Sequence, residues 1–163
     1  MLIKLKNKDT LIFDEFVFKC SIGKNGKKAN KIEGDKTTPK GTFLLKEVYY
    51  RADRVKNLKT KLNLKKIYPN MGWCDDPLSK KYNSLIKTKK NVHHEKMFRK
   101  DHKYDIVIVL DYNLKKPIPY KGSAIFIHLT KNYKSTNGCI SLSKKDLLIL
   151  LRLISKKTKI KIT

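Results

Sequence analysis

Short apolar runs alternate with polar breaks along the first fifty residues, which is the pattern of β-strands joined by tight turns. These runs are rich in β-branched and aromatic residues and are bounded by Asn and Asp. The expected strands cover residues 2–6, 10–13, 16–22 and 42–50. Residues 23–41 hold four of the seven glycines and no apolar run, so they are expected to form a long loop.

The second half of the chain combines apolar runs with one helical pattern. Further strands are expected over residues 104–110, 123–128 and 159–162. A helix is expected over residues 143 to about 155, because Ser143 and the Asp146 three positions later form a capping box. Leucines then follow at 3.6-residue spacing, which is typical of a helix with one buried face.

The middle of the chain, residues 51–103, is less regular. Polar segments surround Trp73, and one short helix is expected near residues 94–99. No linker divides the chain, and its 163 residues suit one domain. The sequence therefore predicts a mainly β fold in a single domain, residues 1–163, with one late α-helix and an irregular middle.

The net charge of +25 first suggests an anionic partner such as nucleic acid, a membrane surface or an acidic polymer. However, 35 of the 39 basic residues are Lys, and they are spread evenly along the chain. Nucleic-acid readers favour Arg, and no DNA- or RNA-binding motif is recognisable. A solvated Lys-rich surface is therefore the favoured interpretation, and nucleic-acid binding is only a distant alternative. No apolar run reaches the ~18 residues of a membrane-spanning helix.

Three cysteines make an odd number that does not suit a disulfide framework. Cys20 lies within an apolar strand and is expected in the core. Cys74 adjoins Trp73 and two carboxylates, which disfavour a thiolate, although it could line a site. No metal is expected, because there is no C-x-x-C pair and His93 and His94 are adjacent. Those two histidines and His102 are expected on the surface.

Cys139 has the strongest potential for chemistry. It follows Gly138 in a polar loop, and His128 lies 11 positions upstream at the end of an apolar strand. A thiol with a pKa of about 8.5 needs a base or a positive field to become largely thiolate at neutral pH. Spacing alone leaves open whether Cys139 is a nucleophile or a small buried hydrophobe.

Three blocks of sequence together resemble the L,D-transpeptidases of the YkuD type. One joins Ile127 and His128 to the run Thr-Asn-Gly-Cys-Ile that ends at Ile140. Another, residues 33–43, is similar to that family's G-D-x-x-T-P-x-G-x-F stretch. The last combines residues 50–54, the W-C-D-D-P segment at 73–77 and Tyr82-Asn83, and is similar to a compact branch of the family.

This resemblance implies a β-barrel or sandwich fold and a cysteine-dependent acyl transfer without metal or cofactor. Cys139 would be the nucleophile and His128 the general base. Backbone N–H groups near Gly138 would hold the oxyanion, and Thr136 and Asn137 would hydrogen-bond the substrate. The residues expected to wall the cleft are Trp73, Asp75, Asp76, Asn83 and Arg51. Trp73 could equally cap the core. Arg51 and Arg54 could equally form salt bridges with Asp75 or Asp76.

Two positions depart from the family pattern. Asn137 stands where His is common before Gly-Cys, and Ser141 stands where an Arg often grips substrate carboxylate. The nucleophile is unaffected, but the substrate detail is left open.

The implied substrate is the peptidoglycan stem peptide, with formation of 3→3 cross-links through a thioester. A hydrolytic L,D-carboxypeptidase is the alternative, and an inactive wall-binding module a more distant one. The substrate implies the cell envelope, yet residues 1–6 alternate apolar and charged side chains and do not resemble a signal peptide. Three alternatives stay open: a mature or trimmed form of the chain, export without such a signal, and a cytoplasmic location with a precursor or turnover fragment as substrate. We expect a monomer.

Overall fold

The computed structural model describes residues 1–88 and 93–163. Its strands are β1 (Leu2–Leu5), β2 (Thr10–Phe13), β3 (Phe16–Ser21), β4 (Lys27–Lys28), β5 (Thr38–Pro39), β6 (Gly41–Tyr50), β7 (Asn63–Lys66), β8 (Met71–Cys74), β9 (Leu85–Lys87), β10 (His94–Lys96), β11 (Ile106–Leu110), β12 (Phe126–Leu129), β13 (Ile140–Leu142) and β14 (Lys159–Ile162). The helix α1 spans Lys144–Leu153. The prediction of a mainly β fold with one late helix is confirmed.

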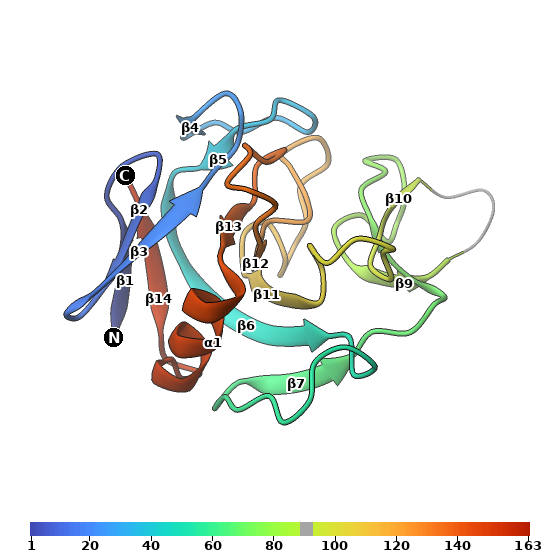
Figure 1. Ribbon diagram of the computed structural model, residues 1–163. Coiled ribbons are helices and arrows are strands. Elements are labelled where there is room, and N and C mark those ends of the chain that lie inside the picture. The colour runs from blue at the N-terminus through green and yellow to red at the C-terminus, as the bar shows by residue number, and fades with distance from the viewer. Residues whose placement is uncertain (89–92) are drawn as a thin grey trace.

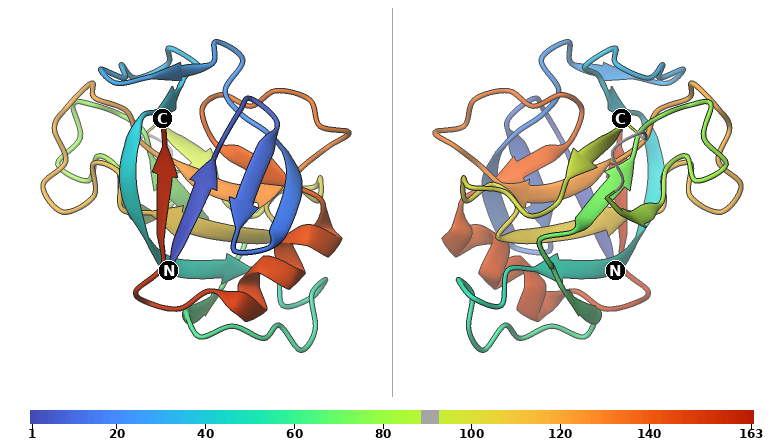
Figure 2. Two further views of the ribbon diagram at one scale, coloured as in Figure 1. Left: turned by 90° about the vertical axis from the view of Figure 1, so that its left-hand side faces the viewer. Right: turned by 90° about the vertical axis from the view of Figure 1, so that its right-hand side faces the viewer.

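A barrel-like sheet forms the body of the molecule (Figure 1). Its strand order is β11-β12-β13-β3-β2-β1-β14-β6-β7, and β6 also pairs with β11. The long strand β6 closes the barrel, because its first half pairs with β14 and its second half with β11. Figure 2 shows β1 and β14 side by side, as their parallel pairing requires.

Alternating side chains fill the barrel. Ile3 and Leu5 of β1 and Ile160 and Ile162 of β14 point inward, while the lysines between them point outward. Helix α1 covers one end of the barrel and buries Leu147, Leu150 and Leu151, which form one face at helical spacing. Its N-cap is Ser143, whose side chain accepts a hydrogen bond from the Asp146 N–H at 3.0 Å, as the capping box predicts.

Two expectations for local structure are wrong. No helix forms near residues 94–99, because β10 occupies residues 94–96 and pairs with β8, with Glu95 opposite Trp73. A helix of one or two turns is unstable by itself, so pairing with an existing strand prevails. The sequence predicts a polar loop around Cys139 that continues to the helix, but residues 140–142 form the buried strand β13 between β12 and β3. Three residues are too few to show a periodicity in the sequence.

Several boundaries also differ. The strand expected from residue 123 begins at Phe126, because Ala124 has a left-handed φ of 51° that interrupts an extended chain. The expected loop 23–41 contains the short pair β4 and β5, and the irregular middle contains β7, β8 and β9. Within residues 1–88 and 93–163, no helix is both long and apolar enough to cross a membrane.

Candidate active site

The thiol of Cys139 lies directly before β13, between two backbone groups of the neighbouring chain. Its Sγ donates a hydrogen bond to Ala124 O at 3.1 Å and accepts one from the Phe126 N–H at 3.4 Å. Cys139 is 9% exposed, whereas Cys20 and Cys74 are almost fully buried. Core packing is thus confirmed for Cys20. Cys139 lines a cavity of about 400 Å³, and neither of the other two thiols is among the residues that line it.

His128 lines the same cavity from the adjacent strand. The parallel pairing of β12 with β13 places His128 opposite Ser141, two residues beyond Cys139. Its Nδ1 lies 2.9 Å from the Leu129 carbonyl oxygen. A carbonyl can only accept a hydrogen bond, so Nδ1 carries the proton and Nε2 of the neutral ring is left as the basic nitrogen. The edge of the Tyr104 ring packs against the imidazole, with ring centroids 5.2 Å apart.

Burial keeps both groups uncharged. It raises the pKa of the Cys139 thiol to about 12. It also lowers the pKa of His128 to about 4, since a desolvated imidazolium is unfavourable. At neutral pH the two groups therefore rest as thiol and imidazole. A reaction that uses the sulfur as a nucleophile would therefore require the thiol proton to move as the sulfur attacks.

A tight turn presents the thiol. The Thr136 hydroxyl donates to Cys139 O at 2.6 Å and accepts from the Gly138 N–H at 3.1 Å. Gly138 has a φ of 137°, and an added Cβ would lie 2.8 Å from Thr37 O, so only glycine fits there. The Thr38 hydroxyl binds Gly138 O at 2.8 Å. Asn137 is exposed and lines the cavity.

The residues expected to wall the cleft mostly lie behind it. Asp75 lines the cavity, but Trp73 and Asn83 are 3% and 2% exposed and pack beneath the site. The Trp73 ring contacts Phe126 edge-on, and Trp73 Nε1 donates to Asn83 Oδ1 at 2.9 Å. Trp73 thus belongs to the core, the alternative that its sequence context left open. The Asp76 carboxylate accepts from the Leu78 N–H in a turn.

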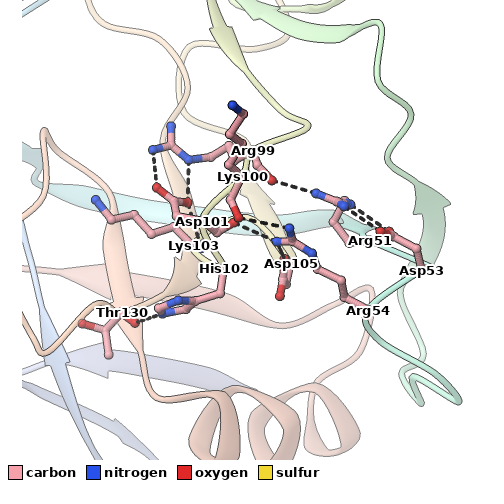
Figure 3. Close-up of polar contacts among 10 residues, drawn as sticks. All are labelled: Arg51, Asp53, Arg54, Arg99, Lys100, Asp101, His102, Lys103, Asp105 and Thr130. Atoms are coloured by element: carbon pink, nitrogen blue, oxygen red, sulfur yellow. Dashed lines mark hydrogen bonds and ion pairs between the residues drawn. The ribbon is translucent and has the colours of Figure 1, made fainter.

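Arg51 and Arg54 are not among the residues that line the cavity, and their polar contacts are drawn in Figure 3. The anticipated salt bridges with Asp75 or Asp76 do not form in the part of the chain that the structure describes. Arg51 instead binds both carboxylate oxygens of the nearby Asp53, at 2.8 and 2.6 Å. The exposed His93 contacts Asp75 at 2.6 Å, and Asp75 in turn lines the cavity.

The two arginines secure the loop formed by residues 99–105. Arg51 donates to Arg99 O at 2.8 Å, and Arg54 donates to the backbone oxygens of Lys100 and Asp101. Arg54 also pairs with Asp105 at 2.9 Å. Because this loop carries Tyr104 against His128, the arginines contribute to the site through the loop.

Sequence reasoning missed several residues of the site. Tyr104 was placed in a strand, although β11 begins only at Ile106. The cavity is also lined by Glu95, Arg99, Lys103, Lys131 and Lys134. The sequence carries no signal for these residues, because the register that places Val107 opposite His128 arises only when β11 and β12 pair. No group of three or more His, Cys, Asp or Glu side chains suited to a metal ion occurs in the described ranges.

Comparison with known proteins identifies the family. The sequence model of the YkuD family, the L,D-transpeptidase catalytic domain, matches residues 3–162. This chain belongs to the L,D-transpeptidase catalytic domain family. A solved structure of an L,D-transpeptidase from Mycobacterium smegmatis is similar with a TM-score of 0.45 and 12% identity, over 99% of this chain and 57% of that one. The chain thus spans somewhat more than half the length of that relative. No curated protein sequence matches the chain.

One departure of this L,D-transpeptidase domain from the family pattern has a clear structural setting. Ser141, which stands where an Arg is frequent, is 1% exposed, and its hydroxyl lies 2.6 Å from the Ser21 hydroxyl. It therefore bonds β13 to β3. Any positive charge offered to a substrate must come from other elements, and Lys36, Lys103, Lys131 and Lys134 line the cavity.

Proposed function

We propose that this domain transfers the acyl group of a peptidoglycan stem peptide through a thioester on Cys139 and forms 3→3 cross-links. The observation that carries the proposal is the pairing of β12 with β13. It brings the Cys139 thiol and the His128 imidazole into one cavity, with His128 Nε2 as the unprotonated nitrogen.

The proposed reaction has two halves. Cys139 Sγ attacks the carbonyl of the third stem residue while His128 Nε2 takes the thiol proton. The carbon–nitrogen bond to the terminal D-alanine breaks, and His128 returns the proton to the leaving amine. An amine of a second stem then attacks the thioester and loses a proton to His128, and the Cys139 thiol is restored as the cross-link forms.

The turn before Cys139 would supply the oxyanion contacts. The Gly138 N–H already donates to Thr136 Oγ1, so we assign the Cys139 N–H as the first oxyanion donor. The Thr136 hydroxyl is used within the turn, and its effect on substrate would pass through the shape of that turn. The exposed Asn137 side chain is the better placed of the two for direct contact with the stem peptide.

Cavity lysines would replace the missing arginine. Lys103 comes from the loop before β11, Lys131 and Lys134 come from the loop after β12, and all three line the cavity. They are placed to receive a stem carboxylate as the donor chain lies across Cys139. We also assign the domain to the cell envelope, because the proposed substrate, peptidoglycan, lies there.

Hydrolysis to a trimmed stem, an L,D-carboxypeptidase reaction, is the second candidate. It is favoured by the charged lining of the cavity, where Glu33, Lys36 and Asp75 would keep water close to the thioester. The acyl-enzyme is the same in both reactions, and only the acceptor differs.

Incubation with a carbapenem followed by intact-mass measurement tests the nucleophile. We expect one adduct on the wild type and on Cys74→Ala, a buried-thiol control, and none on Cys139→Ala. An adduct that persists in Cys139→Ala, or no adduct on the wild type, would refute the proposal. Purified muropeptides then separate the two reactions, because transpeptidation yields dimers and hydrolysis yields tripeptides.

A further inference from the structure

Lys31 is a buried cation close to the proposed nucleophile. Its side chain is 3% exposed, and its Nζ lies 2.7 Å from Asp35 Oδ1. Lysine is the most abundant residue of this chain, and nearly all such residues lie at the surface of proteins unless they are paired. A lysine placed inside, with its own carboxylate, therefore calls for an explanation.

Asp35 is built to hold that cation. Its Oδ1 also accepts from the Thr37 N–H and hydroxyl, and its Oδ2 accepts from the Ile32 N–H at 2.9 Å. Although burial opposes ionisation, the hydrogen bonds from Ile32, Lys31 and Thr37 hold the pKa of Asp35 well below its ordinary value. An ionised Asp35 thus fixes the direction of the Lys31 side chain.

The Lys31 side chain runs between two glycines that flank the site. A Cβ added to Gly122 would lie 2.9 Å from Lys31 Cε, and one added to Gly138 would lie 3.4 Å from Lys31 Nζ. Gly138 directly precedes Cys139. The ammonium group therefore lies against the turn that presents the thiol, and Lys31 is not among the residues that line the cavity.

We propose that Lys31 is a positioning residue for acyl transfer: held by Asp35, it places a fixed positive charge behind Gly138 that favours the anionic sulfur of Cys139 and the oxyanion formed beside it. The inference rests on the proposed function for its role in turnover. Its effect on the thiol can be measured without turnover.

The groups around the Cys139 thiol shift its pKa in opposite directions. Tyr104 and the neutral His128 offer no charge, and Glu95 contributes a negative one. Burial raises the pKa of the Cys139 thiol most strongly, and the hydrogen bond from the Phe126 N–H lowers it; Glu95 then raises it and Lys31 lowers it. Glu95 itself lies 3.6 Å from the Arg99 guanidinium, and Lys31 is the cation that lowers the pKa of the Cys139 thiol.

The rate of iodoacetamide alkylation of Cys139 between pH 7 and pH 10 reports the thiolate fraction. In Lys31→Met we expect the rate at any fixed pH to fall by roughly three- to tenfold, because the thiol pKa rises by up to about one unit. Lys40→Met, which removes an exposed lysine of the same segment, should retain the wild-type rate. Peptide mapping assigns the label to Cys139, and thermal melting confirms that each variant is folded.

Removal of the negative charge of Asp35 should change the alkylation rate of Cys139 in the opposite direction. Asp35→Asn leaves Lys31 uncompensated, so Cys139 should alkylate faster than in the wild type. If Lys31→Met does not fold, Lys31→Met combined with Asp35→Asn removes both charges together and should still slow alkylation, since Lys31 is the member of the pair against Gly138. Slower alkylation in both single variants would indicate loop packing and would overturn the inference.

The two proposals fail in different ways. Wild-type alkylation in Lys31→Met overturns the role of Lys31 and leaves acyl transfer standing if the carbapenem adduct forms. If the wild type forms no adduct but alkylation is slowed in Lys31→Met, the acyl-transfer proposal is refuted. The electrostatic effect of Lys31 on the Cys139 thiol then still stands.

Discussion

Asn83 binds Ala124 and thereby directs a carbonyl at the thiol of Cys139. Asn83 Oδ1 accepts from the Ala124 N–H at 3.0 Å, and Ala124 O accepts from Cys139 Sγ at 3.1 Å. Ala124 has a φ of 51°, a left-handed conformation that costs a non-glycine residue free energy. The same Asn83 oxygen accepts from Trp73 Nε1, so the core beneath the site and the backbone beside the thiol share one anchor.

Asn83→Ala should destabilise the domain and slow acylation. It leaves the Trp73 indole N–H and buried backbone groups without partners, at a total cost of about 3 kcal/mol. Asn57→Ala is a matched control, because Asn57 is exposed and, like Asn83, has a positive φ, here 52°. This substitution should cost no more than about 1 kcal/mol. Urea unfolding measures both. Equal losses would show that backbone conformation matters more than the buried hydrogen bonds.

Gly138→Ala should impair the turn that presents Cys139. The φ of 137° and the approach of the new Cβ to Thr37 O at 2.8 Å predict a loss of about 3 kcal/mol. We also expect at least a roughly tenfold lower rate of carbapenem acylation. Gly26→Ala controls for positive φ alone, since its Cβ would meet no atom within 4 Å. It should cost about 1 kcal/mol and retain acylation, and a normal acylation rate in Gly138→Ala would contradict this account.

Acid should unfold the domain partly through His128. Its pKa is about 4 when folded and 6.5 in the unfolded reference, so between these values the unfolded state binds more protons. Stability must therefore fall as the pH drops from about 6.5 to about 4, by roughly 3 kcal/mol from this group. His128→Gln should flatten that part of the pH profile. A wild-type profile that stays level down to pH 4 would contradict the buried neutral imidazole.

Arg51→Met should loosen the loop of residues 99–105. The change removes the donor to Arg99 O and the contact of the guanidinium with the Phe98 ring, at a cost of about 2 kcal/mol. Faster amide hydrogen exchange in the loop and slower acylation are expected together. Arg152→Met, on the exposed face of α1, should change neither. Faster exchange with unchanged acylation would show that the loop does not influence the reactivity of Cys139.

The net charge of +25 should promote retention on cell-wall sacculi, which carry anionic polymers. The Debye length falls from about 10 Å at 0.1 M salt to about 3 Å at 1 M, so surface attraction should weaken steeply. Sedimentation with sacculi at the two salt concentrations measures retention. Equal retention at both salt concentrations would show that the surface lysines do not hold the domain on the wall and would assign wall binding to the cavity.

The sequence by itself determined the features that depend on near neighbours. Alternation identified β1, β2 and β3, because successive side chains of a strand point to opposite faces. The capping box located α1 for the same reason, since Ser143 and Asp146 meet within one turn. The order of the motif blocks identified the family, which the match over residues 3–162 bears out.

Only the tertiary structure decided which distant residues meet. Asn83 was expected in the cleft wall and lies beneath it, and Lys31 carried no signal among 35 lysines. Its burial depends on Asp35, Gly122 and Gly138 coming together, and Gly122 and Gly138 are roughly ninety residues or more away along the chain. Such contacts form when β6 closes the barrel between β14 and β11, and no local periodicity encodes the result of that closure.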